Sequence, residues 1–343
     1  MLVLGMTFLA SRGQSAQVTY ELVAVGDAGN AADTTGRGAV GYEYGIGRYE
    51  ISIDQYAAFL NAVAASDPND LYSTEAMGLN TAGIARIGPD GFHTYSVAGP
   101  YGITPPGADS PGGRPIAYVT WYDCARFANW MSNGQPTGAQ GPTTTEDGAY
   151  DLVHASPGTA PAVNATNPNT GLPPLYRIPT ENEWYKAAYY KGGSTNAGYW
   201  DYATQSNSLA GNTLGSGASQ ANYVTSVYCV TQQASFAYDQ NYLSNVGGFS
   251  ASPSGYGTFD QTGNVSEWND LSGVAATTRG INGGSWFDVD WTITASASTA
   301  VSLTEMNRYT GFRLVGPVPV PEPSAWAGCG VGLALLAWLR SSR

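Results

Sequence analysis

The sequence predicts a loop-rich globular domain with only a few short helices. Hydrophobic residues make up 43% of the 343 positions, which is ample for a packed core. Gly (44) and Pro (20) together form about a fifth of the chain, which is high for a globular protein but below the level of low-complexity chains. Helical periodicity is confined to three short segments.

The first expected helix lies in the segment RYEISIDQYAAFLNAVAAS, with Asp54 as its N-cap. Its buried face is predicted by apolar residues at the spacing i, i+3, i+4 and i+7. These residues are Tyr56, Phe59, Leu60 and Val63.

Two further helices carry capping signals. Thr120 and Asp123 lie three residues apart at the start of the second helix, and Gly134 marks its end. Thr180 and Glu183 form the same capping box at the start of the third. The residues expected to face the core are Trp121, Cys124, Ala125, Ala128 and Met131 in the second helix and Trp184, Ala187 and Ala188 in the third.

Two long stretches lack any periodicity. Residues 192–256 are predicted to form long ordered loops, and residues 135–174 a surface insertion. Loops of such length in a compact domain need a cross-link or a bound ion to hold one conformation, and metal ions are the obvious candidate. A disulfide could fix these loops only if Cys124 paired with Cys229. We favour the alternative that both are buried free thiols.

The charge balance excludes some classes of partner. Only 12% of residues are charged and the formal net charge is −12. The 14 basic residues are spread along the chain, so no basic stripe is available to neutralise nucleic-acid phosphates or an anionic membrane surface. Nucleic acid is therefore not expected as a partner.

Both ends of the chain resemble export signals. Residues 1–16 begin with an apolar run and resemble the later part of a signal peptide, although a buried first strand is the alternative. Residues 317–343 contain Pro321, Glu322 and Pro323, then an apolar stretch and terminal arginines. This end resembles a PEP-CTERM sorting signal, which implies cleavage by an exosortase, a transient membrane anchor, and delivery to the cell envelope, surface or extracellular matrix.

Six motifs in the body resemble, in order, those of the formylglycine-generating-enzyme (sulfatase-modifying factor) family. They are GRYEISIDQYAAFLNAV, RPIAYVTWYDCARFANWMS, YRIPTENEWYKAAYYKGG, FDQTGNVSEWND, RGINGGSWFD and YTGFRLV. We therefore expect residues 17–316 to form one domain. The resemblance implies an α+β fold, a compact and loop-rich variant of the C-type-lectin-like fold, with structural calcium.

The segment FDQTGNVSEW is the first candidate metal site. Two hard oxygen ligands flank a Gly-Asn turn, although such carboxylates can also cap turns on a solvated loop. The resemblance implies that calcium is bound by the side chains of Asp260 and Glu267 and by the carbonyl groups of Gly263 and Val265.

A second calcium site is implied by the same resemblance. It starts at Asn222 and Tyr223, and Asp239 or Asn241 are the nearest candidates for its other ligands.

The catalytic residues of the family are missing. Its oxidising members bind copper with two cysteines between the GGS and GFR motifs, and residues 285–311 contain none. His93 and His154 also lack the spacing of an iron site. Copper is therefore not expected.

We expect a calcium-stabilised binding protein at the cell surface or in the matrix, with a polysaccharide or protein as its ligand. Trp286, Asp288 and Trp291 are the candidate ligand-binding residues, and core packing is the alternative for each tryptophan. Trp121, Trp184 and Trp268 are assigned to the core. The competing hypotheses are an oxidase of exported proteins with a divergent active site and a purely structural matrix component.

Overall fold

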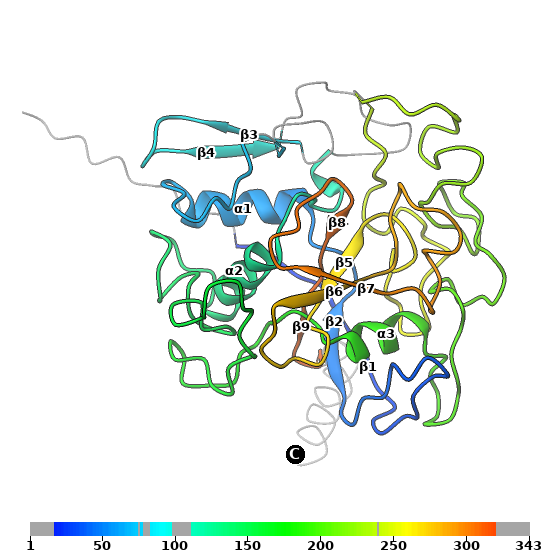
Figure 1. The fold of residues 1–343 in the computed structure, drawn as a ribbon. Coiled ribbons are helices and arrows are strands. Elements are labelled where there is room, and N and C mark those ends of the chain that lie inside the picture. Colours follow the sequence, from blue (N-terminus) through cyan, green and yellow to red (C-terminus); the bar gives the residue numbers. More distant parts are fainter. Residues whose placement is uncertain (1–16, 75, 78–82, 98–110, 239, 320–343) are drawn as a thin grey trace, which may run out of the picture.

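The computed structural model describes residues 17–74, 76–77, 83–97, 111–238 and 240–319. The predicted signal peptide, the Pro321-Glu322-Pro323 signal and Asp239 lie outside these residues. The elements follow one another as β1 (Leu22–Val25), β2 (Tyr44–Gly47), α1 (Ile53–Val63), β3 (Ile84–Ile87), β4 (Thr94–Val97), the 3-10 helix η1 (Pro111–Gly113), α2 (Trp121–Ser132), α3 (Glu181–Tyr189), β5 (Ser266–Asn269), β6 (Thr278–Asn282), β7 (Thr299–Ser302), β8 (Thr310–Gly311) and β9 (Val315–Gly316) (Figure 1).

Three small sheets organise the strands. In the first, β2 lies between β1 and β9, so the beginning and the end of the domain pair with the same strand. A hairpin of β3 and β4 forms the second and packs on α1. The third has the order β7-β6-β5-β8, in which β5 and β8 are parallel and the other pairs antiparallel. This third sheet carries the residues of the candidate site.

The three predicted helices are confirmed, with one correction to their caps. Ser52, not Asp54, caps α1, because its side chain accepts the N–H of Gln55 while the Gln55 side chain accepts the N–H of Ser52. Asp54 lies instead in the first turn, where a negative charge favours the helix dipole. The predicted boxes of α2 and α3 are both present.

The main core forms between α1, α2 and the third sheet. Phe127 of α2 stands at its centre and contacts the rings of Tyr56, Phe59, Trp130 and Phe312. All helix positions predicted to face inward are buried, and Trp121, Trp184 and Trp268 are fully enclosed. Burial of large aromatic rings dominates the energetics of such a core.

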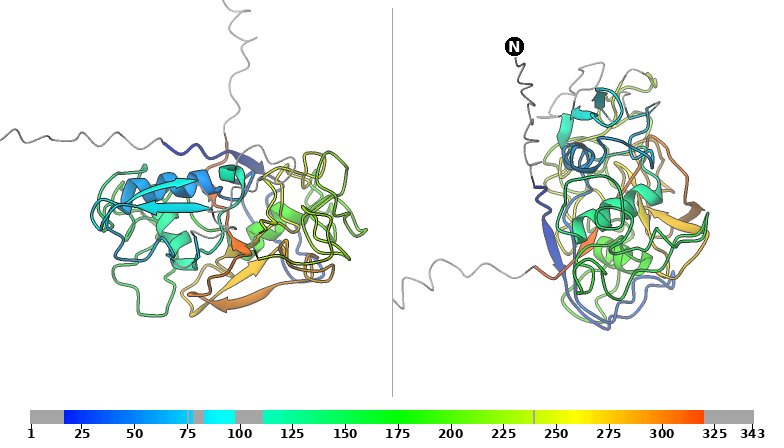
Figure 2. Two further views of the ribbon diagram at one scale, coloured as in Figure 1. Left: turned by 90° about the horizontal axis from the view of Figure 1, so that it is seen from above. Right: turned by 90° about the vertical axis from the view of Figure 1, so that its left-hand side faces the viewer.

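The long stretch between α3 and β5 folds without regular elements, as predicted. Its described residues, 190–238 and 240–265, form no helix or extended strand, only isolated bridges. They gather at the opposite end of the molecule from the loops of residues 135–174 (Figure 2).

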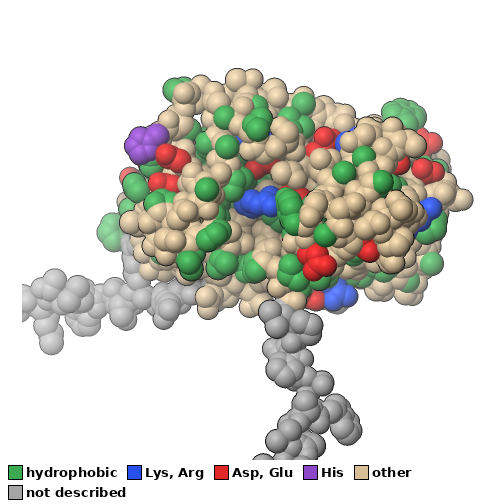
Figure 3. Space-filling model, turned by 90° about the horizontal axis from the view of Figure 1, so that it is seen from below, with side chains coloured by type: hydrophobic (Ala, Val, Ile, Leu, Met, Phe, Trp, Pro, Cys, Tyr) green, Lys and Arg blue, Asp and Glu red, His purple; other side chains and the backbone are tan. Residues whose placement is uncertain are grey.

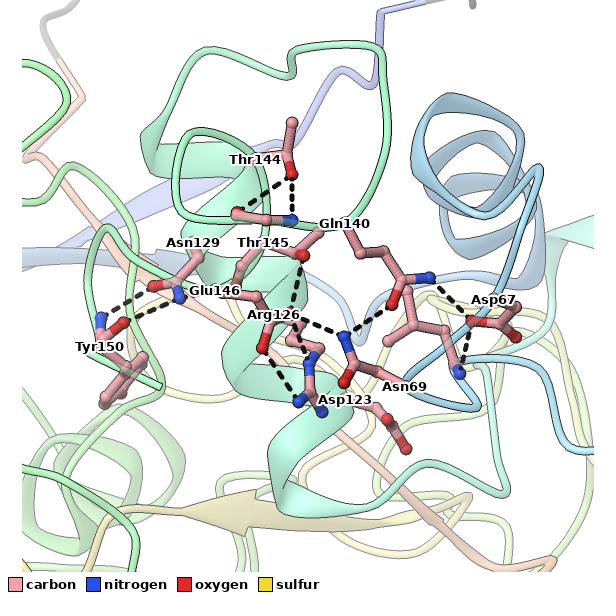
Figure 4. A network of polar contacts seen from close by, with 12 residues as sticks. Asp67, Asn69, Asp123, Arg126, Asn129, Gln140, Thr144, Thr145, Glu146 and Tyr150 are labelled. Carbon is pink, nitrogen blue, oxygen red and sulfur yellow. Dashed lines mark hydrogen bonds and ion pairs between the residues drawn. The ribbon is translucent and has the colours of Figure 1, made fainter. Parts of the chain in front are cut away.

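The predicted insertion over residues 135–174 lies mostly at the surface, and part of it packs on α2. Asn129 of α2 donates to the carbonyl groups of Thr145 and Tyr150 and accepts the N–H of Tyr150 (Figure 4). Arg126 forms an ion pair with Glu146 in the same network. Side chains of the helix thus supply the hydrogen bonds that a loop needs when it is buried.

The structure also bears on the cysteines, on the distribution of charge and on membrane-spanning helices. In the described part of the chain, Cys124 and Cys229 are both free and buried, as favoured. Charged side chains are scattered among other polar groups on the face shown in Figure 3. None of the helices formed by the described residues has both the length and the apolar character needed to cross a bilayer.

A candidate ligand pocket and a buried charge cluster

A buried ion pair lies behind the third sheet. Glu267 of β5 and Arg313 contact each other through two short bonds, Nε to Oε2 and Nη2 to Oε1, both 2.6 Å. The indole N–H of Trp184 donates to the same carboxylate at 2.8 Å. Neither charged side chain is exposed to solvent. The guanidinium also donates to the carbonyl groups of Gly47 and Phe259, so it joins the first sheet to the long loop.

Two further carboxyl groups are buried beside this pair. Asn264 donates to Oε1 of Glu50, and Oε2 has no hydrogen-bond partner among the described residues. Oδ2 of Asp260 accepts the N–H of Gly247, and Oδ1 likewise has no described partner. Three carboxyl groups therefore share one guanidinium, which makes ionisation of all three costly.

Burial raises the pKa of both extra carboxyl groups. The pKa of Asp260 rises to about 6, and that of Glu50 rises well above its usual value, with the charge of Asp260 as a further cause. A folded-state pKa above the unfolded value of ~3.9 means that the folded protein binds more protons between these values. This contribution to stability is complete below about pH 4 and is lost as the pH rises through about 6.

We therefore expect the contribution of Asp260 to stability to decrease between about pH 4 and pH 6, and with it the melting temperature measured in the presence of a chelator. In Asp260→Asn this fall should shrink, because the amide does not titrate. Asp201→Asn, at an exposed position, makes the same charge change as a control and should leave the profile unchanged. Identical profiles for Asp260→Asn and the parent protein would contradict the interpretation.

Of the ligands predicted for the first calcium site, the structure brings the carboxyl groups of Asp260 and Glu267 close enough to interact electrostatically. Gly263 and Asn264 both adopt the left-handed conformation and turn the chain between Asp260 and Glu267. Both oxygens of Glu267 accept hydrogen bonds, from Arg313 and Trp184. Oδ1 of Asp260 and Oε2 of Glu50 are the buried oxygens that suit a hard cation.

At the second predicted site, protein contacts engage the amide nitrogen of Asn222 but not its oxygen. The amide of Asn222 donates to the carbonyl of Tyr242 and to Oδ1 of Asn264, while its own Oδ1 has no partner among the described residues. The hydroxyl of Tyr223 binds the carbonyl of Ala210. Across the described residues, no group of three or more Asp, Glu, His or Cys side chains is arranged to hold a metal ion.

A pocket of about 420 Å³ opens on the third sheet. It lies between strands β5 to β8 and the loop that follows the GGSW motif. Asp288 and Trp291, two of the three predicted ligand-binding residues, line it. Oγ of Ser285 donates to Asp288 at 2.7 Å and so orients the carboxylate. Trp291 is 72% exposed, which leaves much of its indole surface free for contact.

The third predicted binding residue, Trp286, belongs to the core instead. It is 1% exposed and stacks on Tyr242 with the ring centroids 5.0 Å apart. Its neighbour Phe287 is half-exposed and stacks on Tyr309, which lines the pocket. Trp286 is therefore a buried core residue in this structure and is not among the residues that line the pocket.

Sequence reasoning missed most of the pocket residues, and two of these stand out. Asn282 and Thr310 both line the pocket, and the Nδ2 of the first and the Oγ1 of the second are buried without a described hydrogen-bond partner. Their positions directly before the GG of RGINGGSW and the GFR of YTGFR were the available signal. Unpartnered buried polar atoms are rare and call for an explanation.

Neither of the described cysteines is among the residues that line this pocket. Cys124 lies in α2 within the main core, and Cys229 lies in the long loop. Burial raises the pKa of Cys229 to about 12 and that of Cys124 well above its usual value. Both thiols are therefore held in the unreactive protonated form at neutral pH.

A larger hollow of about 760 Å³ lies at the start of α2, lined by residues that include Tyr72, Tyr118 and Asp123. Its wall runs along residues 73–76, of which residue 75 is outside the described part of the chain. We therefore take the pocket on the third sheet as the candidate site.

The architecture defines a domain of the sulfatase-modifying-factor class. A model of the "Sulfatase-modifying factor enzyme 1-like domain" matches residues 23–317, and the chain belongs to this family. Its fold is accordingly the mixed α+β, C-type-lectin-like fold that the sequence predicted, with few short helices and small sheets.

Several solved structures are similar to this chain. Variable protein 1 of Treponema denticola shares 17% identity over 89% of this chain and 98% of its own, with a TM-score of 0.46. CarF shares 20% identity over 88% and 99%, also with a TM-score of 0.46. PvdO from Pseudomonas aeruginosa shares 17% identity over 87% and 92%, with a TM-score of 0.40. No curated protein sequence matches significantly.

Proposed function

We propose that this protein is an exported, calcium-stabilised binding protein of the cell surface or matrix that lacks the copper-cysteine oxidase site of its relatives. The observation that carries the proposal is the chemistry of the pocket wall. Between the GGS and GFR motifs that wall presents Asp288, Trp291 and Tyr309, and no thiol. Copper(I) needs soft sulfur ligands, which oxygen groups do not replace.

Export is proposed from the two ends of the chain. The apolar run within residues 1–16 and the Pro321-Glu322-Pro323 signal support processing at both ends, with an exosortase-type enzyme as the partner at the C-terminal end. The apolar stretch before the terminal arginines supports a transient membrane anchor during this processing.

Calcium is proposed on the unpartnered oxygens of Asp260 and Glu50. Their burial beside Glu267 leaves excess negative charge, and a bound divalent cation would neutralise it. We leave Glu267 out of the proposed ligand set because Arg313 already neutralises its charge. Because protons stabilise the same carboxyl groups, the effect of calcium is expected to be largest above about pH 6.

The proposed function is tested by metal analysis of the mature protein purified from its native host. We expect bound calcium, no stoichiometric copper, and no oxidation of a cysteine-containing sulfatase peptide. Chelation should lower the melting temperature at pH 7.5, since a ligand that binds only the folded state stabilises it.

Asp260→Asn should abolish most of the response to the chelator, and Asp201→Asn should keep it. Stoichiometric copper with turnover of the thiol peptide would instead establish an oxidase with a divergent active site. A chelator response that is the same in Asp260→Asn and the parent protein would overturn the proposed calcium site.

A further inference from the structure

We infer that the pocket on the third sheet binds the ring of a neutral saccharide. The inference rests on the proposed binding function and names its ligand class. It is carried by the hydrogen-bonding groups in the pocket lining, the exposed indole at the rim, and the charges of the wall.

Two residues that line the pocket have a buried polar group without a described hydrogen-bond partner. Asn282 is 3% exposed and Thr310 is 1% exposed, yet Nδ2 of the first and Oγ1 of the second have no hydrogen-bond partner among the described residues. The other end of the Asn282 amide accepts a hydrogen bond from Asn269 at 3.3 Å, which orients the NH₂ group. Leaving such buried groups unsatisfied is unfavourable. A ligand hydroxyl is the group that suits both, because a hydroxyl both donates and accepts.

The rim supplies a flat apolar surface. Trp291 is 72% exposed, and its backbone is held by a hydrogen bond from its N–H to Asp290. The next residue, Thr292, donates its N–H and its hydroxyl to the carbonyl of Val289. A tryptophan on an ordered turn offers a large and rigid amphipathic surface at little entropic cost. The C–H face of a sugar ring is the complementary ligand surface.

The charges of the wall exclude anionic ligands. Asp288 and Glu305 line the pocket, and no Lys, Arg or His is among its described lining residues. The formal net charge of −12 adds to the repulsion. Carboxylates do accept hydrogen bonds from sugar hydroxyls, so a neutral saccharide suits these walls and a chain of uronic acids or sulfated sugars does not.

The size of the pocket agrees with a saccharide ring. Its volume of about 420 Å³ lies in the range of small-molecule sites. Ten of the sixteen residues that line the pocket carry a hydroxyl, amide or carboxyl group, beside apolar surface, and a sugar ring offers both hydroxyl groups and C–H faces to such a wall. A free sugar and a residue of a longer glycan present the same chemistry to such a wall.

The inference is tested by calorimetric titration of the mature protein with neutral oligosaccharides of glucose, mannose, galactose and N-acetylglucosamine. Oligogalacturonate is the anionic counterpart, and the free monosaccharides form the second arm. We expect at least one neutral sugar to bind and oligogalacturonate not to bind. If the oligosaccharide binds more tightly than its monomer, the natural ligand is a longer glycan. If the two bind equally, the natural ligand is a free sugar.

Two variants separate ligand contact from folding. Thr310→Val removes the unpartnered hydroxyl at nearly constant volume, so its melting temperature should be equal or higher. Trp291→Ala removes an exposed ring. Each should weaken sugar binding about tenfold or more, which corresponds to about 1.4 kcal/mol. Trp200→Ala, a half-buried tryptophan that is not among the pocket-lining residues, is the matched control and should keep the parent affinity.

The failure of this inference is distinguishable from failure of the proposed function. Absence of binding to every neutral sugar, or unchanged affinity in both Thr310→Val and Trp291→Ala, overturns the saccharide assignment. Binding of a peptide that depends on Thr310 and Trp291 also overturns the saccharide assignment, but it agrees with the proposed binding function. Copper-dependent oxidation of a thiol peptide overturns the proposed function itself.

Discussion

Glu267→Gln is expected to destabilise the folded protein by about 3–5 kcal/mol. The substitution keeps the size of the side chain but removes the charge that balances Arg313, and both groups are fully buried. The guanidinium would then face an amide that brings its own N–H donors, in a place where water cannot compensate. A loss of this size is read from the midpoint of equilibrium denaturation in urea.

The matched control is Glu21→Gln. The partner of Glu21 is Arg48, and their ion pair is exposed, at 54% and 37% of the side-chain surfaces. Exposed pairs contribute about 0–1 kcal/mol, so this control should shift the midpoint only slightly. Equal midpoint shifts in the two variants would show that Arg313 does not depend on Glu267. Since Glu267 is a structural residue here, Asp260→Asn is the better probe of calcium.

The second large effect is expected from Asp270→Asn. Asp270, directly after β5, accepts hydrogen bonds from the indole of Trp121 at 2.8 Å, the hydroxyl of Tyr150 at 2.5 Å and Nε of Arg279 at 3.0 Å. The ion pair with Arg279 is 1% exposed on both sides. The amide leaves this buried guanidinium without a charge partner, so we again expect a loss of about 3–5 kcal/mol.

This loss should also have a local signature. Tyr150 belongs to the segment of residues 135–174, so weakening its bond to Asp270 should increase hydrogen exchange and proteolysis within that segment. Asp151→Asn is the control, because Asp151 pairs with the exposed His154, and the two side chains keep 34% and 78% of their surfaces exposed. Stability within 1 kcal/mol of the parent, or unchanged protection of the segment, would argue against a central role of Asp270.

Local features of the fold followed from the sequence because their causes are local. The capping boxes of α2 and α3 join residues three apart, and the apolar stripes follow helical spacing. The prediction failed at the N-cap of α1, where two nearby residues were both suitable. Ser52 and Asp54 both suit an N-cap, and the side chain of Gln55 selects Ser52.

Burial of single aromatic residues was beyond local reasoning. Trp286 and Trp291 lie five positions apart in one polar loop, and the sequence left both open as ligand contacts. Trp286 is enclosed because Tyr242 and Phe236, from another part of the chain, stack on it. No such partner covers Trp291 among the described residues, so this ring is exposed.

The sequence by itself determined the family, through six ordered motifs, and the absence of a cysteine pair between the last two of them. Tertiary structure alone decided that Glu267 pairs with Arg313, 46 residues away, and that Glu50 meets Asn264, 214 residues away. It also placed Asn282 and Thr310 together in the lining of one pocket. The physical reason is that ionisation, burial and hydrogen-bond satisfaction depend on neighbours in space, which only the packing of distant loops brings together.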